Sequence, residues 1–107
     1  MPSKGHCDGK MKMVYTTAKK KDAMPIAEKL LNERLAGCVN MFPVQSMYWW
    51  KGRIEKDSEV GMLIKVKDAK KAVKRIKDLH PYELPAILVF DVKGYAPFAR
   101  WIEKVCK

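Results

Sequence analysis

The sequence contains few of the residues that mark common catalytic and metal-binding motifs. Its 107 residues include two histidines and three cysteines, and no two cysteines form a CxxC pair. Neither a zinc knuckle nor a thioredoxin-like redox site is therefore supported. Nucleophile elbows, phosphate-binding glycine loops, HExxH motifs and dinucleotide fingerprints are also missing. We therefore expect a protein that is not an enzyme.

Long apolar runs are missing as well. No run approaches the roughly 20 residues that a membrane-spanning helix needs. The first ten residues, MPSKGHCDGK, do not contain the apolar centre of a secretory signal. We therefore expect a cytoplasmic protein with no membrane partner. At this length we expect a flexible extension over residues 1–10 and a single domain over residues 11–107.

Acidic residues are scarce relative to basic ones, 12 against 22, which gives a formal net charge of +10. This excess favours anionic partners such as nucleic acid, phosphate ligands or a membrane surface. Several lysines recur along segment 69–79, on the outer side of a predicted amphipathic helix. Such a stripe is more typical of a solvated helix face, so we do not expect nucleic acid as a partner. A basic nucleic-acid binder stays as an alternative.

The chain is organised around the stretch from Cys38 to Val66, in which two β-rich runs flank Lys51 and Gly52. A two-residue loop with glycine second favours a primed hairpin turn, because glycine accepts positive φ. Counting outwards from this loop places Trp50 opposite Arg53 and Cys38 opposite Lys65.

Pro43 interrupts the first arm of this predicted hairpin. Proline cannot donate a backbone hydrogen bond to a neighbouring strand, so we expect a bulge or break at this position.

Alternation along the hairpin separates two faces. One is a core face, made of Val39, Met41, Val60, Met62, Ile64 and Val66. The other is mixed in character and is made of Cys38, Asn40, Phe42, Tyr48, Trp50, Glu59, Leu63 and Lys65.

The predicted hairpin is long for so small a chain. Each arm of about 13 residues, at about 3.3 Å per residue, spans about 43 Å. A compact chain of this length is only about 34 Å across. The tip holds Tyr48, Trp49, Trp50 and Ile54, and exposed apolar surface with free strand edges typically marks an interface. We expect an oligomer; the alternative is a shorter, bent hairpin that folds over its own core.

The remaining segments complete an α+β pattern. Strands are predicted over 11–18 and 86–92. Helices are predicted after Asp22, which would cap the first of them, after Asp68, which would cap the second, and over 95–107. Gly37 is the predicted stop of the first helix. The order βαββαβ plus a C-terminal helix predicts a ferredoxin-like sandwich with two helices on one face of four antiparallel strands. The closing helix is expected to pack through Phe98, Trp101, Ile102 and Val105.

A stiff connector, HPYELP, follows the second predicted helix and contains His80 and Glu83. Imidazole suits copper, nickel and zinc, and a nearby carboxylate is a plausible second ligand. Two ligands are too few for a tight site, so a third group would come from another strand or subunit. The alternative is that His80 caps the helix C-terminus and Glu83 pairs with a lysine.

The mixed hairpin face is a second candidate site. Lys65, together with Tyr48, Trp50 and Tyr82, could line an intersubunit cleft that binds a small anion. The alternative is that Glu59 and Lys65 form interface ion pairs and hold no ligand.

Four groups of residues resemble the CutA family of divalent-cation-tolerance proteins. They are Gly37-Cys38-Val39-Asn40, Tyr48-Trp49-Trp50-x-Gly52, Ser58-Glu59-Val60 with Lys65, and His80-Pro81-Tyr82-Glu83-x-Pro85. The likeness runs from about Met13 to Trp101. It implies a ferredoxin-like fold similar to PII signalling proteins, a homotrimer, binding of copper and other divalent metals, a role in cation tolerance and, in prokaryotes, a cytoplasmic location.

The chain departs from this family pattern at two positions. Thr16 stands where some bacterial members have cysteine, and Leu79 where they have a second histidine. His80 is the matching ligand that remains. We therefore expect a homotrimeric, non-enzymatic protein that binds copper or another divalent cation through His80, with Glu83 as its partner. The alternative is a PII-like regulatory module that binds a small anion near Lys65.

Overall fold

The structure is a computed structural model that describes residues 8–107. Its elements in chain order are β1 (Gly9–Ala18), α1 (Lys20–Asn32), β2 (Cys38–Trp50), β3 (Arg53–Val66), α2 (Ala69–Leu79), β4 (Ile87–Gly94) and α3 (Ala96–Val105). None of the helices in the described part of the chain is long and apolar enough to cross a membrane.

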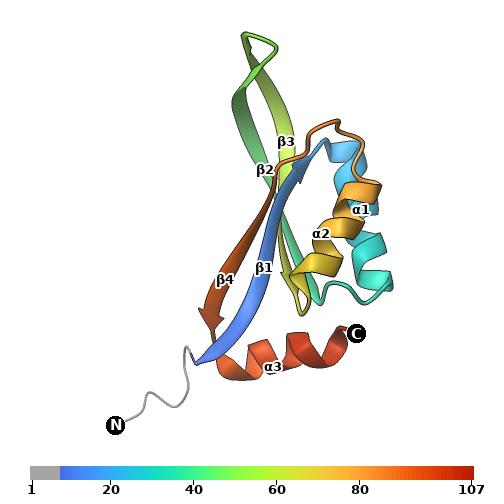
Figure 1. Ribbon diagram of the computed structural model, residues 1–107, viewed down its shortest axis with the longest axis vertical. Helices are drawn as coiled ribbons and strands as arrows, with labels where there is room; N and C mark the ends of the chain where they lie inside the picture. Colours follow the sequence, from blue (N-terminus) through green and yellow to red (C-terminus); the bar gives the residue numbers. More distant parts are fainter. Residues whose placement is uncertain (1–7) are drawn as a thin grey trace.

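The four strands form one antiparallel sheet in the order β2-β3-β1-β4. α1 and α2 cover one face of this sheet, and α3 lies across its lower end (Figure 1). This confirms the predicted α+β, ferredoxin-like fold. β1 begins at Gly9, which pairs with Gly94, so the strand starts two residues before the expected boundary of the domain. The rest of the predicted extension, residues 1–7, lies outside the described residues.

The β2–β3 hairpin has the predicted register along its whole length, from Trp50 opposite Arg53 to Cys38 opposite Lys65. Both loop residues have positive φ, 52° at Lys51 and 79° at Gly52. These angles define a type I′ turn, whose twist matches that of the strands.

The predicted bulge at Pro43 is wrong, because Pro43 pairs with Val60 in an unbroken register. β2 is an edge strand of the sheet. A proline on an edge strand, with its nitrogen turned away from the neighbouring strand, removes no hydrogen bond from the ladder.

The hairpin extends well beyond the helices that cover the rest of the sheet (Figure 1). The chain measures 54 × 30 × 21 Å along its principal axes. At the tip, Trp49 is 72% exposed and Ile54 is 57% exposed. The structure therefore has the projecting hairpin rather than the bent alternative, and its apolar tip is uncovered within one chain.

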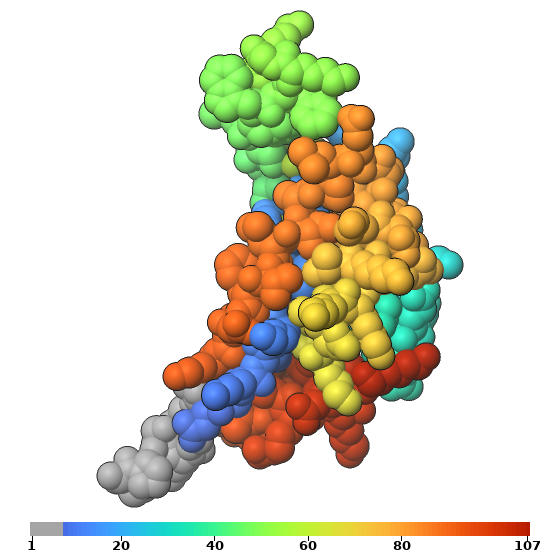
Figure 2. Space-filling view, in the orientation of Figure 1, coloured from blue at the N-terminus to red at the C-terminus, as the bar shows by residue number. Residues whose placement is uncertain are grey.

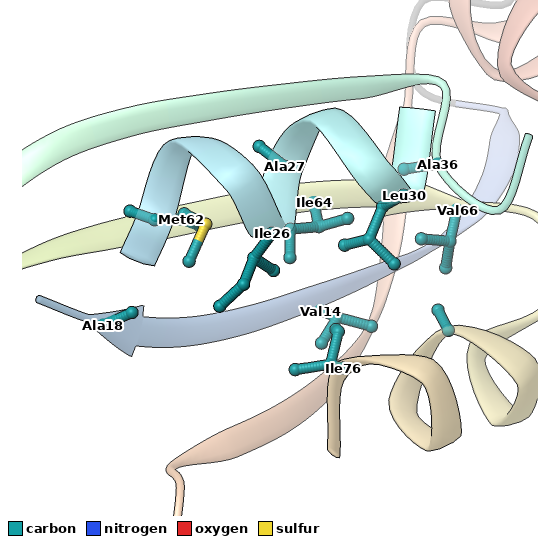
Figure 3. Close-up of a cluster of buried hydrophobic side chains, with 12 residues drawn as sticks. Val14, Ala18, Ile26, Ala27, Leu30, Ala36, Met62, Ile64, Val66 and Ile76 are labelled. Carbon is teal, nitrogen blue, oxygen red and sulfur yellow. The ribbon is translucent and has the colours of Figure 1, made fainter. Parts of the chain in front are cut away.

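The hydrophobic core lies between the sheet and the two helices α1 and α2 (Figure 3). Its buried residues are Val14, Ala18, Ala23, Ile26, Ala27, Leu30, Ala36, Met62, Ile64, Val66, Ala72 and Ile76. Three predicted core positions on β3 are therefore confirmed. Met41, also predicted on the core face, is 37% exposed, because it lies on edge strand β2 while the helices contact β1 and β3.

Of the three predicted helix ends, the structure confirms the cap at Asp68 and contradicts the cap at Asp22 and the stop at Gly37. Asp68 caps α2 as predicted, and its side chain accepts a hydrogen bond from the Lys71 backbone N–H at 3.1 Å. The N-cap of α1 is Lys19 rather than Asp22, which lies in the first turn. The backbone N–H of Asp22 donates to the Lys19 carbonyl at 2.9 Å, so the helix begins before Asp22 can cap it.

The first helix does not end at Gly37 as predicted. It ends at Asn32, and Arg34 takes the left-handed conformation with φ of 61°. The Leu35 N–H donates to the Leu30 carbonyl at 2.9 Å and the Arg34 N–H donates to the Leu31 carbonyl at 3.1 Å. This pair of bonds is a Schellman motif, which an arginine closes here in place of the usual glycine.

Gly37 instead provides space for α3. A Cβ atom at this position would lie 2.9 Å from both Ile102 Cδ1 and Val105 Cγ2. α3 packs through Ala99 and Ile102, whereas Trp101, predicted on the packing side, is 46% exposed and stacks on Phe98 with the ring centroids 5.9 Å apart.

Gly37→Ala is expected to destabilise the protein by about 1–3 kcal/mol, because the added methyl group overpacks the contact with α3. The free energy of unfolding in urea measures this effect. Gly52→Ala is the matched control: no atom lies within 4 Å of its Cβ, so that its cost arises from the φ of 79° alone. An unchanged free energy of unfolding in Gly37→Ala would contradict the packing of α3 against this position.

Candidate functional site

The connector between α2 and β4 begins at His80, which is 7% exposed. Its ring Nε2 lies 2.7 Å from the Thr17 carbonyl oxygen, and the Tyr82 backbone N–H donates to Nδ1 at 3.2 Å. A carbonyl only accepts and an amide N–H only donates, so the ring fits as the neutral tautomer with its proton on Nε2. Nδ1 then carries the lone pair, on the side of the connector.

His80 also ends α2, because its backbone N–H donates to the Ile76 carbonyl at 2.8 Å. This agrees with the expected cap position. The other half of that alternative, a pairing of Glu83 with a lysine, is not found among the ion pairs of residues 8–107, and Glu83 is exposed.

The metal ligands available from one chain are few. Within the described residues, no group of three or more His, Cys, Asp or Glu side chains is placed to hold a metal ion. The connector contains both predicted ligands, His80 and Glu83. Thr16 lies on β1, next to Thr17, and is fully buried. Its hydroxyl has no hydrogen-bond partner within the described structure.

Two tyrosines of the predicted cleft bind carboxylates on the sheet face opposite the helices, which we call the uncovered face. The Tyr82 hydroxyl donates to Glu59 Oε2 at 2.6 Å, and the Tyr48 hydroxyl donates to Asp57. Lys19 completes the group by donating to Asp57 Oδ1 at 3.1 Å. Tyr82 therefore links the connector to the uncovered face.

Asp57 and Lys19 were not among the residues predicted from the sequence. Asp57 could have been found from the register, because it lies two residues from Glu59 on the same face and diagonal to Tyr48 across the hairpin. Lys19 is contributed by the end of β1, and no pattern in the sequence brings it to this place.

These contacts shift the ionisation of three groups. Burial raises the pKa of Tyr82, and its hydrogen bond to Glu59 raises it further. The hydrogen bond to Asp57 is the main reason that the pKa of Tyr48 rises to about 12. The same bond, with that from Lys19, lowers the pKa of Asp57. Both phenols are therefore hydrogen-bond donors, and Asp57 is an ionised acceptor, at neutral pH.

Lys65, the predicted anion ligand, lies elsewhere. Its ammonium donates to the Asn40 side chain and lies 4.0 Å from Cys38 Sγ. Tyr48 is opposite Glu55, ten residues from Lys65 along β3, a separation of about 33 Å at about 3.3 Å per residue. Trp50 lies near the tip, with Lys51 Nζ 5.9 Å from its ring centroid. One chain thus does not bring Lys65 to the tyrosines, and a cleft that holds all four residues requires a second copy.

The fold and the connector define a class of proteins with a PII-like, ferredoxin-like architecture. The structure described as PII-like protein CutA from Nostoc sp. PCC 7120 matches with a TM-score of 0.87 at 31% identity, over 91% of this chain and 98% of that one.

Sequence comparison narrows the class to a family. The chain is 42% identical over 96 residues to the divalent-cation tolerance protein CutA of Pyrococcus horikoshii, which covers 86% of this chain and 94% of that protein. It is 38% identical over 95 residues to the protein of the same description from Archaeoglobus fulgidus, over 85% and 93% of the two chains. The family profile described as CutA1 divalent ion tolerance protein matches residues 12–105. The chain belongs to this family, which confirms the resemblance seen in its motifs.

An alkaline titration followed by tyrosine ultraviolet absorbance is expected to show Tyr48 ionising with a pKa of about 12. Asp57→Asn removes the charge that favours the protonated phenol, so the pKa of Tyr48 should fall towards its ordinary value of 10.0. Because the pKa is raised in the folded state, the contact stabilises the fold below pH 10.0 and this contribution is lost as the pH rises towards about 12. Tyr48→Phe assigns the transition; an identical transition in Asp57→Asn would refute the contact.

Proposed function

We propose that this chain is a homotrimeric, non-catalytic cytoplasmic protein that acts in divalent-cation tolerance by binding copper or another divalent cation. His80 Nδ1 is the principal ligand and Glu83 is the second. The observation that carries the proposal is the hydrogen bond between His80 Nε2 and the buried Thr17 carbonyl.

This bond prepares the imidazole for a metal. A histidine that binds a metal is neutral, and it usually donates its other ring N–H to a backbone carbonyl or a carboxylate. His80 meets this requirement through Thr17, which leaves the lone pair on Nδ1. Its present partner, the Tyr82 N–H at 3.2 Å, is at the long end of the hydrogen-bond range. Such a bond is worth about 1 kcal/mol, which a metal ligand bond exceeds. Imidazole ligands favour copper over the other divalent first-row metals.

Glu83 shares the connector with His80 and is exposed, so its carboxylate is free to turn towards an incoming cation. Two ligands leave the coordination incomplete. Water or a group from a second copy of the chain would supply the remaining positions.

Exposed apolar surface supports the proposed trimer. Large hydrophobic residues are uncovered at the hairpin tip and along edge strand β4; they are Met47, Tyr48, Trp49, Ile54, Leu88, Val89 and Phe90. Both β2 and β4 are edge strands with unpaired backbone groups. Surface of this kind typically marks contacts between chains.

The anion-binding alternative has less support. Tyr48 and Tyr82, two of its four residues, donate their hydroxyls to Asp57 and Glu59. These carboxylates would repel an anion, whereas they would not oppose a cation. The alternative depends on Lys65 of another copy.

A copper titration of the purified oligomer, followed by calorimetry, is expected to saturate near one ion per chain. His80→Gln keeps a donor for Thr17 but removes the imidazole, so binding at this site should be lost while the melting temperature shows that the fold remains. Glu83→Gln should weaken binding by about tenfold, the effect of losing one charged ligand.

The matched control for the copper titration is His6→Ala, which removes the other histidine of the chain. His6 lies outside the described residues. Binding that survives His80→Gln but disappears in His6→Ala would place the copper site in the N-terminal segment and overturn the proposal.

Sedimentation equilibrium is expected to give three times the chain mass of 12.3 kDa. Trp49→Glu, which puts a charge into the apolar tip, should shift the population towards single chains. Lys56→Glu is a control for a charge change on the same hairpin. A folded wild-type protein that sediments as a single chain at micromolar concentration would contradict the trimer.

A further inference from the structure

A pocket of about 480 Å³ lies against α3, on the side of the sheet that carries the buried Val66. The start of β1, the ends of β3 and β4, and α3 line this pocket. In Figure 2 the start of β1 is blue and α3 is red, and both lie in the lower half of the molecule. Its floor is apolar and buried, with Val66, Ala99 and Ile102. A volume of this size is in the range of pockets that bind small molecules.

The rim of this pocket is basic. Four lysines line it, Lys10, Lys12, Lys67 and Lys93, together with the carboxylates of Asp91 and Glu103. Lys12 is paired with Asp91. The other three lysines take part in no ion pair within residues 8–107. The pocket therefore carries an excess of positive charge above an apolar floor.

Two of these lysines repel each other across the β1–β4 pair, which destabilises the fold. Lys10 lies directly opposite Lys93 in the β1–β4 register, and both line the pocket. Like charges directly opposite each other in a sheet are destabilising. An anion between the two ammonium groups would remove this repulsion, and Lys67 would approach it from a third segment.

We propose that this pocket binds a small organic phosphate. The phosphate oxygens interact with the ammonium groups of Lys10, Lys67 and Lys93, and the apolar part of the molecule lies on Val66 and Ile102. A phosphate group carries up to two negative charges, and lysine binds phosphate as a point charge. A single carboxylate would leave more of the repulsion in place.

A neighbouring hollow extends the pocket along α3. It shares Lys10, Ala99 and Glu103 with the pocket, and among charged residues it adds Arg100 and Asp8. Arginine binds phosphate through two parallel hydrogen bonds, so a ligand with more than one phosphate group could reach it. The pocket is separate from His80 and from the uncovered face, so this proposal does not depend on the metal site.

The test is a calorimetric titration of the purified oligomer with ATP and with inorganic tripolyphosphate, at about 0.15 M salt so that weak surface attraction is screened. Saturable ATP binding that is tighter than tripolyphosphate binding supports the proposal, because both probes have three phosphate groups and only ATP has a base and sugar to cover the floor. Equal affinities overturn the role of the floor, and no saturable binding of either probe overturns the site.

A pair of matched double variants separates the pocket from the general charge of the protein. Lys67→Gln with Lys93→Gln removes two rim charges, whereas Lys70→Gln with Lys74→Gln removes two exposed charges from α2. The first should weaken ATP binding by about a hundredfold or more, since two charge-assisted contacts are lost and each contributes about a factor of ten or more. The second should change the affinity by less than about twofold. Equal weakening in both overturns the site.

Lys93→Glu directly tests the repulsion between Lys10 and Lys93. It replaces the like-charge pair with an opposite-charge pair across β1 and β4, so the melting temperature without ligand should rise while ATP binding is lost. A lysine with a merely structural role would lose stability on this change. Unchanged ATP affinity in Lys93→Glu overturns the proposal.

Discussion

The unbroken pairing of β2 with β3 is the constraint on which the rest of the structure depends. Because side chains alternate along a strand, this single register decides which residues of both arms enter the core and which reach the uncovered face. It buries Met62 and Ile64 beneath α1. The same register places Asp57 and Glu59 on the opposite face, where they accept hydrogen bonds from Tyr48 and Tyr82.

The connector after α2 joins the two sides of the sheet. His80 is held by a carbonyl of β1, while Tyr82, two residues later, reaches a carboxylate on β3. The rings of His80 and Tyr82 lie 4.5 Å apart. A change at His80, such as the proposed metal binding, would therefore occur next to Tyr82, whose hydroxyl contacts Glu59 on the uncovered face.

Much of the fold could be predicted from the sequence, because hairpin register and strand order follow from local patterns. The turn at Lys51-Gly52 and the alternation of the arms were sufficient for the register of the hairpin. Two of the errors arose where long-range packing decides. Gly37 was read as a helix stop but serves the packing of α3, and Trp101 was read as a packing residue but is exposed. The site was harder to predict, because Lys19 and Thr17 reach it only through the tertiary structure, and because the partners of His80 are backbone groups that carry no signal in the sequence.

The continuous ladder also limits how the length of this protein can vary in evolution. A residue gained or lost in one arm alone would turn every later side chain of that arm to the wrong side of the sheet. Paired gains or losses beside Lys51 and Gly52 would alter only the projecting end. Related chains should therefore differ in hairpin length by matched steps at the tip, while the base that carries the core and the carboxylates keeps its spacing.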